Sequence, residues 1–245
     1  MVGISERKLG ITKHTTIPFN DQKAGTSGLR KSTKVFQQIN YVENFIQSFL
    51  KALNEDIEKE CKPDEKVSLF VGGDGRYFVP ECTIKILKIC AAHPRINKIY
   101  VAKDGLMSTP AVSCCIRKYK TFAGIILTAS HNPGGIDNDF GIKFNCSNGG
   151  PALQNLTDKV FTISKTISEF EQVMPLECDI AKIGEHEFQI EDRNFNIQII
   201  DSVQDYSDLM KNIFDFDALR AYFKSGTKIT VNALNGGKKI SYLKT

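Results

Sequence analysis

The feature that most constrains this chain is a short apolar run that ends abruptly in a loop of small and polar residues. Residues 124–135 read GIILTASHNPGG. The aliphatic run in it is typical of a buried strand in a sheet covered on both faces. Asn-Pro and Gly-Gly are turn formers, so a loop carrying Ser130, His131 and Asn132 follows directly. Ligands bind α/β sheets just beyond the carboxyl ends of strands, so we expect a binding site here.

Two interpretations of this loop are open on the residues alone. In the first, Ser130 is a phosphate carrier or nucleophile, because a serine hydroxyl can attack when a base or a strong local field assists it. His131 is a candidate for that assistance, and backbone N–H groups near the glycines are suited to hold phosphate oxygens. In the second, the loop is an ordinary turn in which Ser130 and Asn132 hydrogen-bond to their own backbone.

The rest of the chain alternates between strand and helix patterns. This alternation predicts an α/β fold with a mixed, mainly parallel sheet sandwiched by helices. We expect an arm or edge strand in residues 1–20, and a short strand at 142–145 that brings Lys143 back toward Ser130. The expected helices are 42–57, 80–93, 109–118 and 153–170, and the expected strands are 67–71, 98–102 and 125–127.

The pattern weakens between residues 174 and 196, which we interpret as the edge of a first domain spanning residues 1–200. Residues 201–245 then read as the incomplete start of a second, similar domain. They contain a helix at 203–214 that 216–223 continues, followed by a strand at 228–233. One strand and one or two helices bury too little apolar surface to close a core.

Composition excludes several classes of function. The net charge is only +4 and the basic residues are scattered, so we expect no nucleic-acid partner. No apolar run approaches the ~20 residues that span a bilayer, and the N-terminus has no signal-peptide core, so we expect no membrane association. Seven cysteines form no C-x-x-C pair. Several lie in apolar helical patterns, which favours a reducing compartment and a cytoplasmic protein.

Three further polar segments lie between these elements. Residues 25–30 form a tight turn that can present hydroxyls and the Arg30 guanidinium to a phosphate, although the residues alone favour a purely structural turn. Residues 72–76 (GGDGR) offer a single carboxylate, so we interpret them as structural rather than as a metal loop. Asp137-Asn138-Asp139 lacks calcium-loop spacing and is interpreted as a solvated turn.

Six segments, in order, resemble the α-D-phosphohexomutases, and the eukaryotic phosphoglucomutases in particular. They are residues 21–30 (DQKAGTSGLR), 72–76 (GGDGR), 106–113 (LMSTPAVS), 128–133 (TASHNP), 140–145 (FGIKFN) and 148–152 (NGGPA). The resemblance extends from about residue 15 to residue 233. It implies a phosphoserine at Ser130, with His131 and Lys143 as catalytic groups beside it. It also implies a substrate-binding role for Thr26, Ser27, Arg30 and Asn132, although Asn132 is also suited to shaping the loop.

The implied reaction interconverts glucose 1-phosphate and glucose 6-phosphate, with glucose 1,6-bisphosphate as intermediate and activator. The implied cofactor is Mg²⁺, held partly by the phosphate of Ser130. In the resembled family, magnesium is also held by an acidic loop of a third domain, and a fourth domain grips the substrate phosphate. This chain has no Asp-x-Asp-x-Asp loop and departs from the family pattern after Ala233. It resembles only the N-terminal portion, so we expect it to be inactive alone.

Three hypotheses follow for the 245-residue chain. It is an incomplete copy of a longer mutase, a short non-catalytic binding or regulatory protein with a protein partner, or an unstable truncation. The retained Ser130 and Asn132 favour the first over a long-standing loss of chemistry. The third predicts uncovered apolar surface at Phe214, Phe216 and Phe223.

Overall fold

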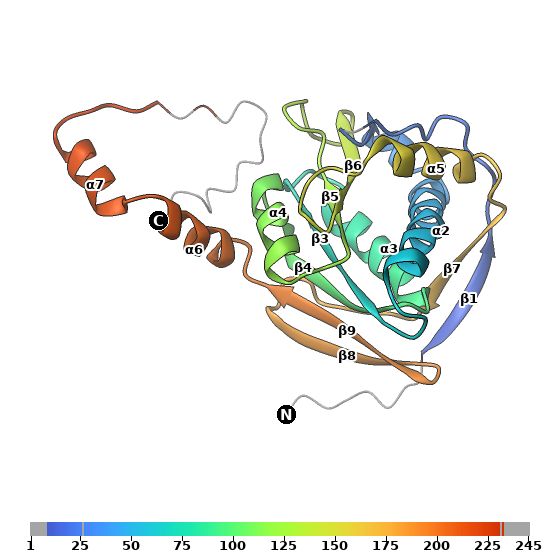
Figure 1. The fold of residues 1–245 in the computed structure, drawn as a ribbon. Helices are drawn as coiled ribbons and strands as arrows, with labels where there is room; N and C mark the ends of the chain where they lie inside the picture. Colours follow the sequence, from blue (N-terminus) through green and yellow to red (C-terminus); the bar gives the residue numbers. More distant parts are fainter. Residues whose placement is uncertain (1–8, 26, 231, 233–245) are drawn as a thin grey trace.

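A seven-stranded mixed sheet forms the centre of the protein (Figure 1), which a computed structural model describes at residues 9–25, 27–230 and 232. The four strands β5, β3, β4 and β9 pair in parallel, whereas β2, β6 and β8 join by antiparallel pairing. This confirms the predicted mixed, mainly parallel sheet. In spatial order the strands are β2 (Leu29–Ser32), β6 (Asp139–Cys146), β5 (Ala123–Leu127), β3 (Val67–Gly73), β4 (Ile96–Leu106), β9 (Arg193–Ile200) and β8 (Gly184–Ile190).

Helices cover both faces of this sheet, as the sequence predicted. Successive side chains of a strand point to opposite faces, so Ile125 and Leu127 pack into one core while Ile126 packs into another. The larger core is closed by α2 (Tyr41–Glu60), α3 (Val79–Ala92) and α5 (Gln154–Ser164), with the short α1 (Thr33–Phe36) at its edge. The smaller core lies beneath α4 (Thr109–Lys118). The predicted helices at 42–57, 80–93 and 109–118 are confirmed.

A separate two-stranded sheet joins the N-terminal segment to the middle of the chain. β1 (Gly10–Thr15) pairs antiparallel with β7 (Glu169–Met174). This agrees with an edge strand within residues 1–20, of which 1–8 lie outside the described residues. The helix predicted at 153–170 is wrong at its end, because α5 stops at Ser164 and β7 follows.

The C-terminal region also differs from its prediction. After the β8–β9 hairpin come two separate helices, α6 (Gln204–Ile213) and α7 (Phe216–Lys224). They are not continuous because Phe214 is extended and Asp215 caps α7, with its carboxylate accepting from the N–H groups of the first turn. Residues 228–230 and 232 are not in a strand, and the rest of the strand predicted at 228–233 lies outside the described residues.

The cysteines are all free, and Cys82, Cys90, Cys114 and Cys115 are buried, in agreement with their interpretation as small core residues. None of the helices in the described part of the chain combines the length and apolar character needed to cross a membrane.

Candidate active site

The serine loop, residues 128–138, leaves the carboxyl end of β5 and returns to the sheet through β6. All five residues of β5 are buried, as the sequence predicted. β5 runs parallel to β3 with Leu127 opposite Gly73, so the segments that follow both strands emerge at the same edge of the sheet. The serine loop therefore lies where α/β sheets bind ligands.

Ser130 combines an exposed side chain with a strained backbone. Its φ of 59° lies in the left-handed region, which costs a non-glycine residue about 1–2 kcal/mol. Its N–H donates to Thr128 Oγ1 at 3.0 Å, and its carbonyl oxygen accepts from Arg76 Nη2 at 2.9 Å. The surrounding structure thus fixes both backbone polar groups of Ser130 while the residue stays exposed.

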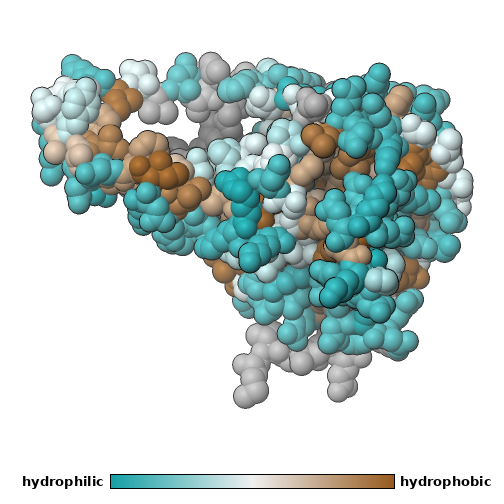
Figure 2. Space-filling view, in the orientation of Figure 1, coloured by the Kyte–Doolittle hydropathy of each residue, from teal (hydrophilic) through white to brown (hydrophobic). Residues whose placement is uncertain are grey.

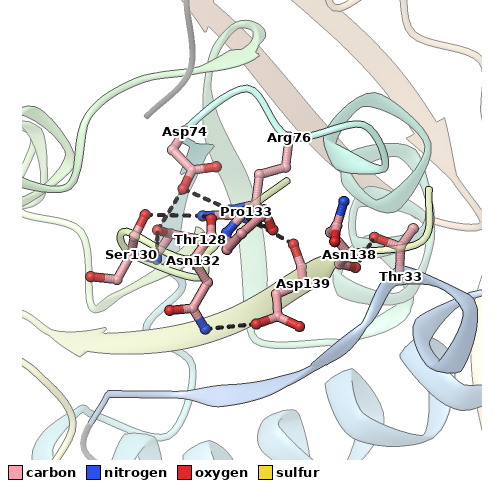
Figure 3. Close-up of polar contacts among 9 residues, drawn as sticks. All are labelled: Thr33, Asp74, Arg76, Thr128, Ser130, Asn132, Pro133, Asn138 and Asp139. Atoms are coloured by element: carbon pink, nitrogen blue, oxygen red, sulfur yellow. Dashed lines mark hydrogen bonds and ion pairs between the residues drawn. The ribbon is translucent and has the colours of Figure 1, made fainter. Parts of the chain in front are cut away.

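Arg76 fastens the serine loop to the segment that follows β3 (Figure 3). Its side chain is only 5% exposed. Nη2 donates to the carbonyl oxygens of Ser130 and Asn132, both at 2.9 Å. Nη1 donates to the carbonyl oxygens of Pro133 and Asp139, at 3.2 and 2.8 Å. The Arg76 side chain therefore donates to four backbone carbonyl oxygens and so fixes the conformation of the loop.

Asp74 connects the two groups that hold Ser130. Its Oδ2 accepts from Arg76 Nε at 3.0 Å and from the Thr128 hydroxyl at 2.7 Å. The charge of the buried guanidinium is thus balanced by a carboxylate in direct contact, which is the condition under which a buried charge is tolerated.

Asn132 and His131 differ in their surroundings. The Asn132 amide Nδ2 donates to Asp139 Oδ2 at 2.6 Å, which braces the start of the loop against the first residue of β6. This contact fits the interpretation that Asn132 shapes the loop. His131 follows Ser130 directly and is exposed.

Arg30 and Lys143 lie on one face of the β2–β6 pair. Arg30 is opposite Gly141, and Lys143 is two residues further along β6, which puts both side chains on the same face. The neighbouring Phe144 stacks on Phe49 of α2 on the other face, with ring centroids 3.8 Å apart. Burial and, secondarily, the charge of Arg30 lower the pKa of Lys143. Two neighbouring cations favour an anion such as a phosphate.

The turn before Arg30 approaches β6 closely because it contains Gly28. This residue has a φ of 89°, and a Cβ on it would lie 2.6 Å from the carbonyl oxygen of Ile142. The same added Cβ would lie 2.9 Å from the Cβ of Lys143. Only glycine therefore fits at this position beside Lys143. Ser27 is exposed in this turn. Thr26, the remaining predicted substrate contact, lies outside the described residues.

The described residues do not fit a magnesium site of their own. They contain no group of three or more His, Cys, Asp or Glu side chains able to hold a metal ion. Two carboxylates near the loop are already engaged: Asp139 accepts from Asn132, and Asp137 pairs with Lys34 at 2.5 Å. Mg²⁺ requires an octahedral set of oxygens, of which Ser130 or its phosphate would supply one.

The sequence interpretation missed the role of Arg76, Asp74 and Thr128. It described residues 72–76 as structural but did not connect them with the serine loop. A usable signal was present, because strands were predicted directly before both segments. Adjacent parallel strands place the residues after them at one edge of the sheet.

Comparison with known proteins agrees with this arrangement. Residues 21–171 match the family model described as phosphoglucomutase/phosphomannomutase, alpha/beta/alpha domain I. Phosphoglucomutase-1 of rabbit (Oryctolagus cuniculus) is 47% identical and that of Homo sapiens 46% identical, each over 226 residues covering 90% of this chain. The same alignments cover only 39% of either relative, so the chain spans about two fifths of their length.

A solved structure gives the same result. The crystal structure of the exocytosis-sensitive phosphoprotein pp63/parafusin, a phosphoglucomutase from Paramecium in its open form, superposes with a TM-score of 0.82 at 41% identity. The match covers 90% of this chain and 40% of that one. The motif matches, the identity and the shared fold together show that the chain belongs to the phosphoglucomutase/phosphomannomutase family and corresponds to an N-terminal portion of a phosphoglucomutase.

Proposed function

We propose that this chain carries the phosphoserine of a phosphoglucomutase, which interconverts glucose 1-phosphate and glucose 6-phosphate. The single observation that carries the proposal is the exposed Ser130, held in a left-handed conformation at the carboxyl end of β5. A residue is kept in a strained conformation only where the surrounding structure enforces it, and such strain is concentrated at functional sites. The membership of the family supplies the reaction class.

In the proposed reaction, the phosphoryl group on Ser130 Oγ moves to the free hydroxyl of a glucose monophosphate. The Oγ–P bond breaks while a P–O bond to the sugar forms, and the hydroxyl proton leaves to a base. The resulting glucose 1,6-bisphosphate then presents its other phosphoryl group, which returns to Ser130 with the reverse proton transfer. Each cycle restores the phosphoserine and exchanges the position of the sugar phosphate.

The cations of the site have distinct proposed roles. Lys143, with its lowered pKa, gives up a proton more readily than an ordinary lysine, which suits a group that moves protons near Ser130. The planar guanidinium of Arg30 suits the phosphate of a substrate. His131 is the second candidate for proton transfer, and Thr26, Ser27 and Asn132 are the remaining proposed substrate contacts.

Magnesium and the activator glucose 1,6-bisphosphate remain part of this proposal through the family. A metal ion bound at the phosphoryl group would neutralise part of the charge of the transferred oxygens. The described residues contribute only Ser130 to such a site, so we propose that turnover requires acidic ligands from beyond them.

We also propose a domain boundary and a cellular setting. Residues 1–200 form the first domain, and residues 201–245 begin a second, because α6 and α7 contain no buried residue whereas β9 is integrated into the sheet. The seven free cysteines favour the reducing environment of the cytoplasm. The proposed partners are sugar phosphates, without nucleic acid or membrane.

The experiment that tests this function follows both turnover and the phosphoserine. The purified chain is incubated with Mg²⁺, glucose 1-phosphate and glucose 1,6-bisphosphate, and glucose 6-phosphate is measured by a coupled assay. In parallel, mass spectrometry follows phosphate on the Ser130 peptide, with Ser130→Ala as control. We expect phosphorylation at Ser130 with little or no turnover. Absence of phosphate from Ser130 in the folded chain would contradict the carrier role and favour a non-catalytic binding protein.

A further inference from the structure

We propose that Arg76 is the positioning residue of the serine loop, and that it acts together with Asp74 and Thr128 to set the conformation of Ser130. The proposal deepens the proposed function and rests on it where it concerns phosphoryl transfer. It goes beyond that function because Arg76 touches no reacting atom. It controls the backbone from which the reacting hydroxyl projects (Figure 3).

The hydrogen bonds of Arg76 exclude a role as a phosphate ligand. A guanidinium has five N–H donors. Nε donates to Asp74, Nη1 to the carbonyl oxygens of Pro133 and Asp139, and Nη2 to those of Ser130 and Asn132. All five donors are therefore committed within the protein, and the side chain is 5% exposed. Arg76 has no N–H left for a ligand, in contrast to the exposed Arg30.

A closed set of contacts connects Arg76 with both backbone groups of Ser130. Arg76 holds the carbonyl oxygen, and Thr128 Oγ1 holds the N–H. Asp74 Oδ2 accepts from both of these side chains. Since φ of Ser130 is 59°, these contacts offset the strain of a left-handed serine. Without them, we expect the loop to relax to conformations in which the hydroxyl points elsewhere.

Lysine cannot take the place of Arg76. Its ammonium group is a point charge with three donors on one nitrogen, whereas the four carbonyl oxygens and the Asp74 carboxylate are arranged around a planar fork. The positive charge alone is therefore insufficient, and Arg76→Lys should behave like Arg76→Ala. This distinguishes a positioning role from a role in which the charge of Arg76 attracts phosphate.

Hydrogen exchange of the full 245-residue chain tests the proposal without relying on turnover. The amides of Ser130, Asn132 and Asp139 are hydrogen-bonded within the loop and should be protected in the unmodified protein. We expect Arg76→Ala and Arg76→Lys to accelerate exchange in residues 128–139 by about tenfold or more, with β3 and β5 unchanged. Exchange that is unchanged in the loop, or accelerated equally throughout the sheet, would overturn the proposal.

Arg95→Ala provides the matched control. Arg95 also donates to backbone carbonyl oxygens, those of Lys62 and Glu65, at 2.8 and 2.9 Å, but in a turn before β3. Its removal should loosen that turn and leave the serine loop unaffected. If Arg76→Ala fails to fold, Thr128→Val replaces it, because valine keeps the shape and loses the oxygen that holds Ser130 N–H. Thr128→Ser should then restore protection.

Chemical rescue separates positioning from general destabilisation. Adding about 20 mM guanidinium, far below denaturing concentrations, should restore protection of the loop in Arg76→Ala and not in Arg76→Lys, whose side chain fills the site. A rescue that is absent in Arg76→Ala, or equal in both variants, contradicts the proposal.

The rate at which Ser130 takes up phosphate from glucose 1,6-bisphosphate gives the second readout. It should fall about tenfold or more in Arg76→Ala and recover with guanidinium. If the unmodified chain takes up no phosphate, the proposed function fails, while the exchange experiment still decides the role of Arg76.

Discussion

Lys143 is the residue whose ionisation reports most directly on the candidate phosphate site. Burial is the larger cause of its lowered pKa and the charge of Arg30 the smaller one. Arg30→Gln should therefore raise the pKa of Lys143 only part of the way toward the ordinary value, as followed by NMR of ¹³C-labelled lysine. Because the folded-state pKa is lowered, this group makes the folded state more stable as pH rises from that pKa toward the unfolded value. An unchanged pKa of Lys143 in Arg30→Gln would contradict the placement of both side chains on one face of the β2–β6 pair.

Phosphate at Ser130 should raise the pKa of Lys143, in the direction opposite to the effects of burial and of Arg30. A phosphoserine carries nearly two negative charges at neutral pH, and a nearby anion favours the charged form of lysine. If Lys143 faces the phosphoserine as proposed, phosphorylation of Ser130 raises its pKa. The control is Lys159 of α5, whose Nζ lies 2.7 Å from Glu55 Oε2. This ion pair is not part of the serine loop, so the pKa of Lys159 should not respond. Equal responses of both lysines would indicate a general effect and remove the support for Lys143.

The sequence predicted the position of Ser130 and its neighbours well, because a buried strand that runs into a turn is a local signal. It did not predict what holds them. The contacts of Arg76 with the serine loop join residues more than 50 positions apart, and they depend on the register of β3 with β5. The left-handed φ of Ser130 was equally inaccessible, since it follows from those contacts and not from any preference of serine.

At the scale of elements, one acidic side chain links α6 to the end of α4. Asp205 accepts from Lys118 Nζ at 2.5 Å and from the Tyr119 hydroxyl at 2.7 Å. Burial and then the hydrogen bond with Asp205 raise the pKa of Tyr119. Since the folded-state pKa is raised, this contribution to stability is fully present below the ordinary tyrosine pKa of about 10 and is lost as pH rises through the raised value.

Asp205→Asn tests this contact. Asparagine keeps an oxygen that accepts from Tyr119 but removes the negative charge, so the pKa of Tyr119 should fall while staying above the ordinary value because burial remains. Absorbance titration of tyrosinate measures the shift. Asp208→Asn is the matched control, because Asp208 lies on the same helix and pairs with Lys211 at 3.6 Å. Superimposable titrations of Asp205→Asn and the unmodified chain would exclude the proposed contact.

Two errors in the predicted elements have different physical origins. Ile163, Ile167 and Phe170 fit helical spacing, but Phe170 pairs with His14 of β1, a partner far away in the sequence. No local pattern reveals such a partner, and burial of Phe170 is satisfied equally well by either structure. The break between α6 and α7, in contrast, had a local signal, since Asp215 is a favoured N-cap residue directly before a segment with apolar residues at helical spacing.

At the scale of the whole molecule, α6 and α7 extend away from the seven-stranded sheet, and several of their apolar side chains are exposed (Figures 1 and 2). Neither helix contains a buried residue, although both are amphipathic. Phe214 is 50% exposed, and Phe223 is 40% exposed. A hollow of about 770 Å³ lies between the two helices, with Phe214 and Phe216 among its mainly polar and charged lining residues and none from the serine loop. Exposed apolar side chains that gather on neighbouring helices are a liability for association.

We therefore expect the 245-residue chain to self-associate through α6 and α7. Over an about tenfold rise in concentration, sedimentation velocity should show a growing fraction of larger species, because association follows mass action. Phe214→Glu combined with Phe223→Glu should keep the chain monomeric, since two charges on the apolar faces oppose their burial.

The control for this effect is Ile39→Glu. Ile39 is the more exposed side chain, at 86%, but it lies between α1 and α2, away from α6 and α7. Its substitution should leave association unchanged if contiguity of the patch, rather than exposure of a single apolar residue, drives it. A chain that stays monomeric throughout would show that the uncovered faces of α6 and α7 are stable in water. Self-association of the double variant to the same extent as the unmodified chain would place the contact elsewhere on the molecule.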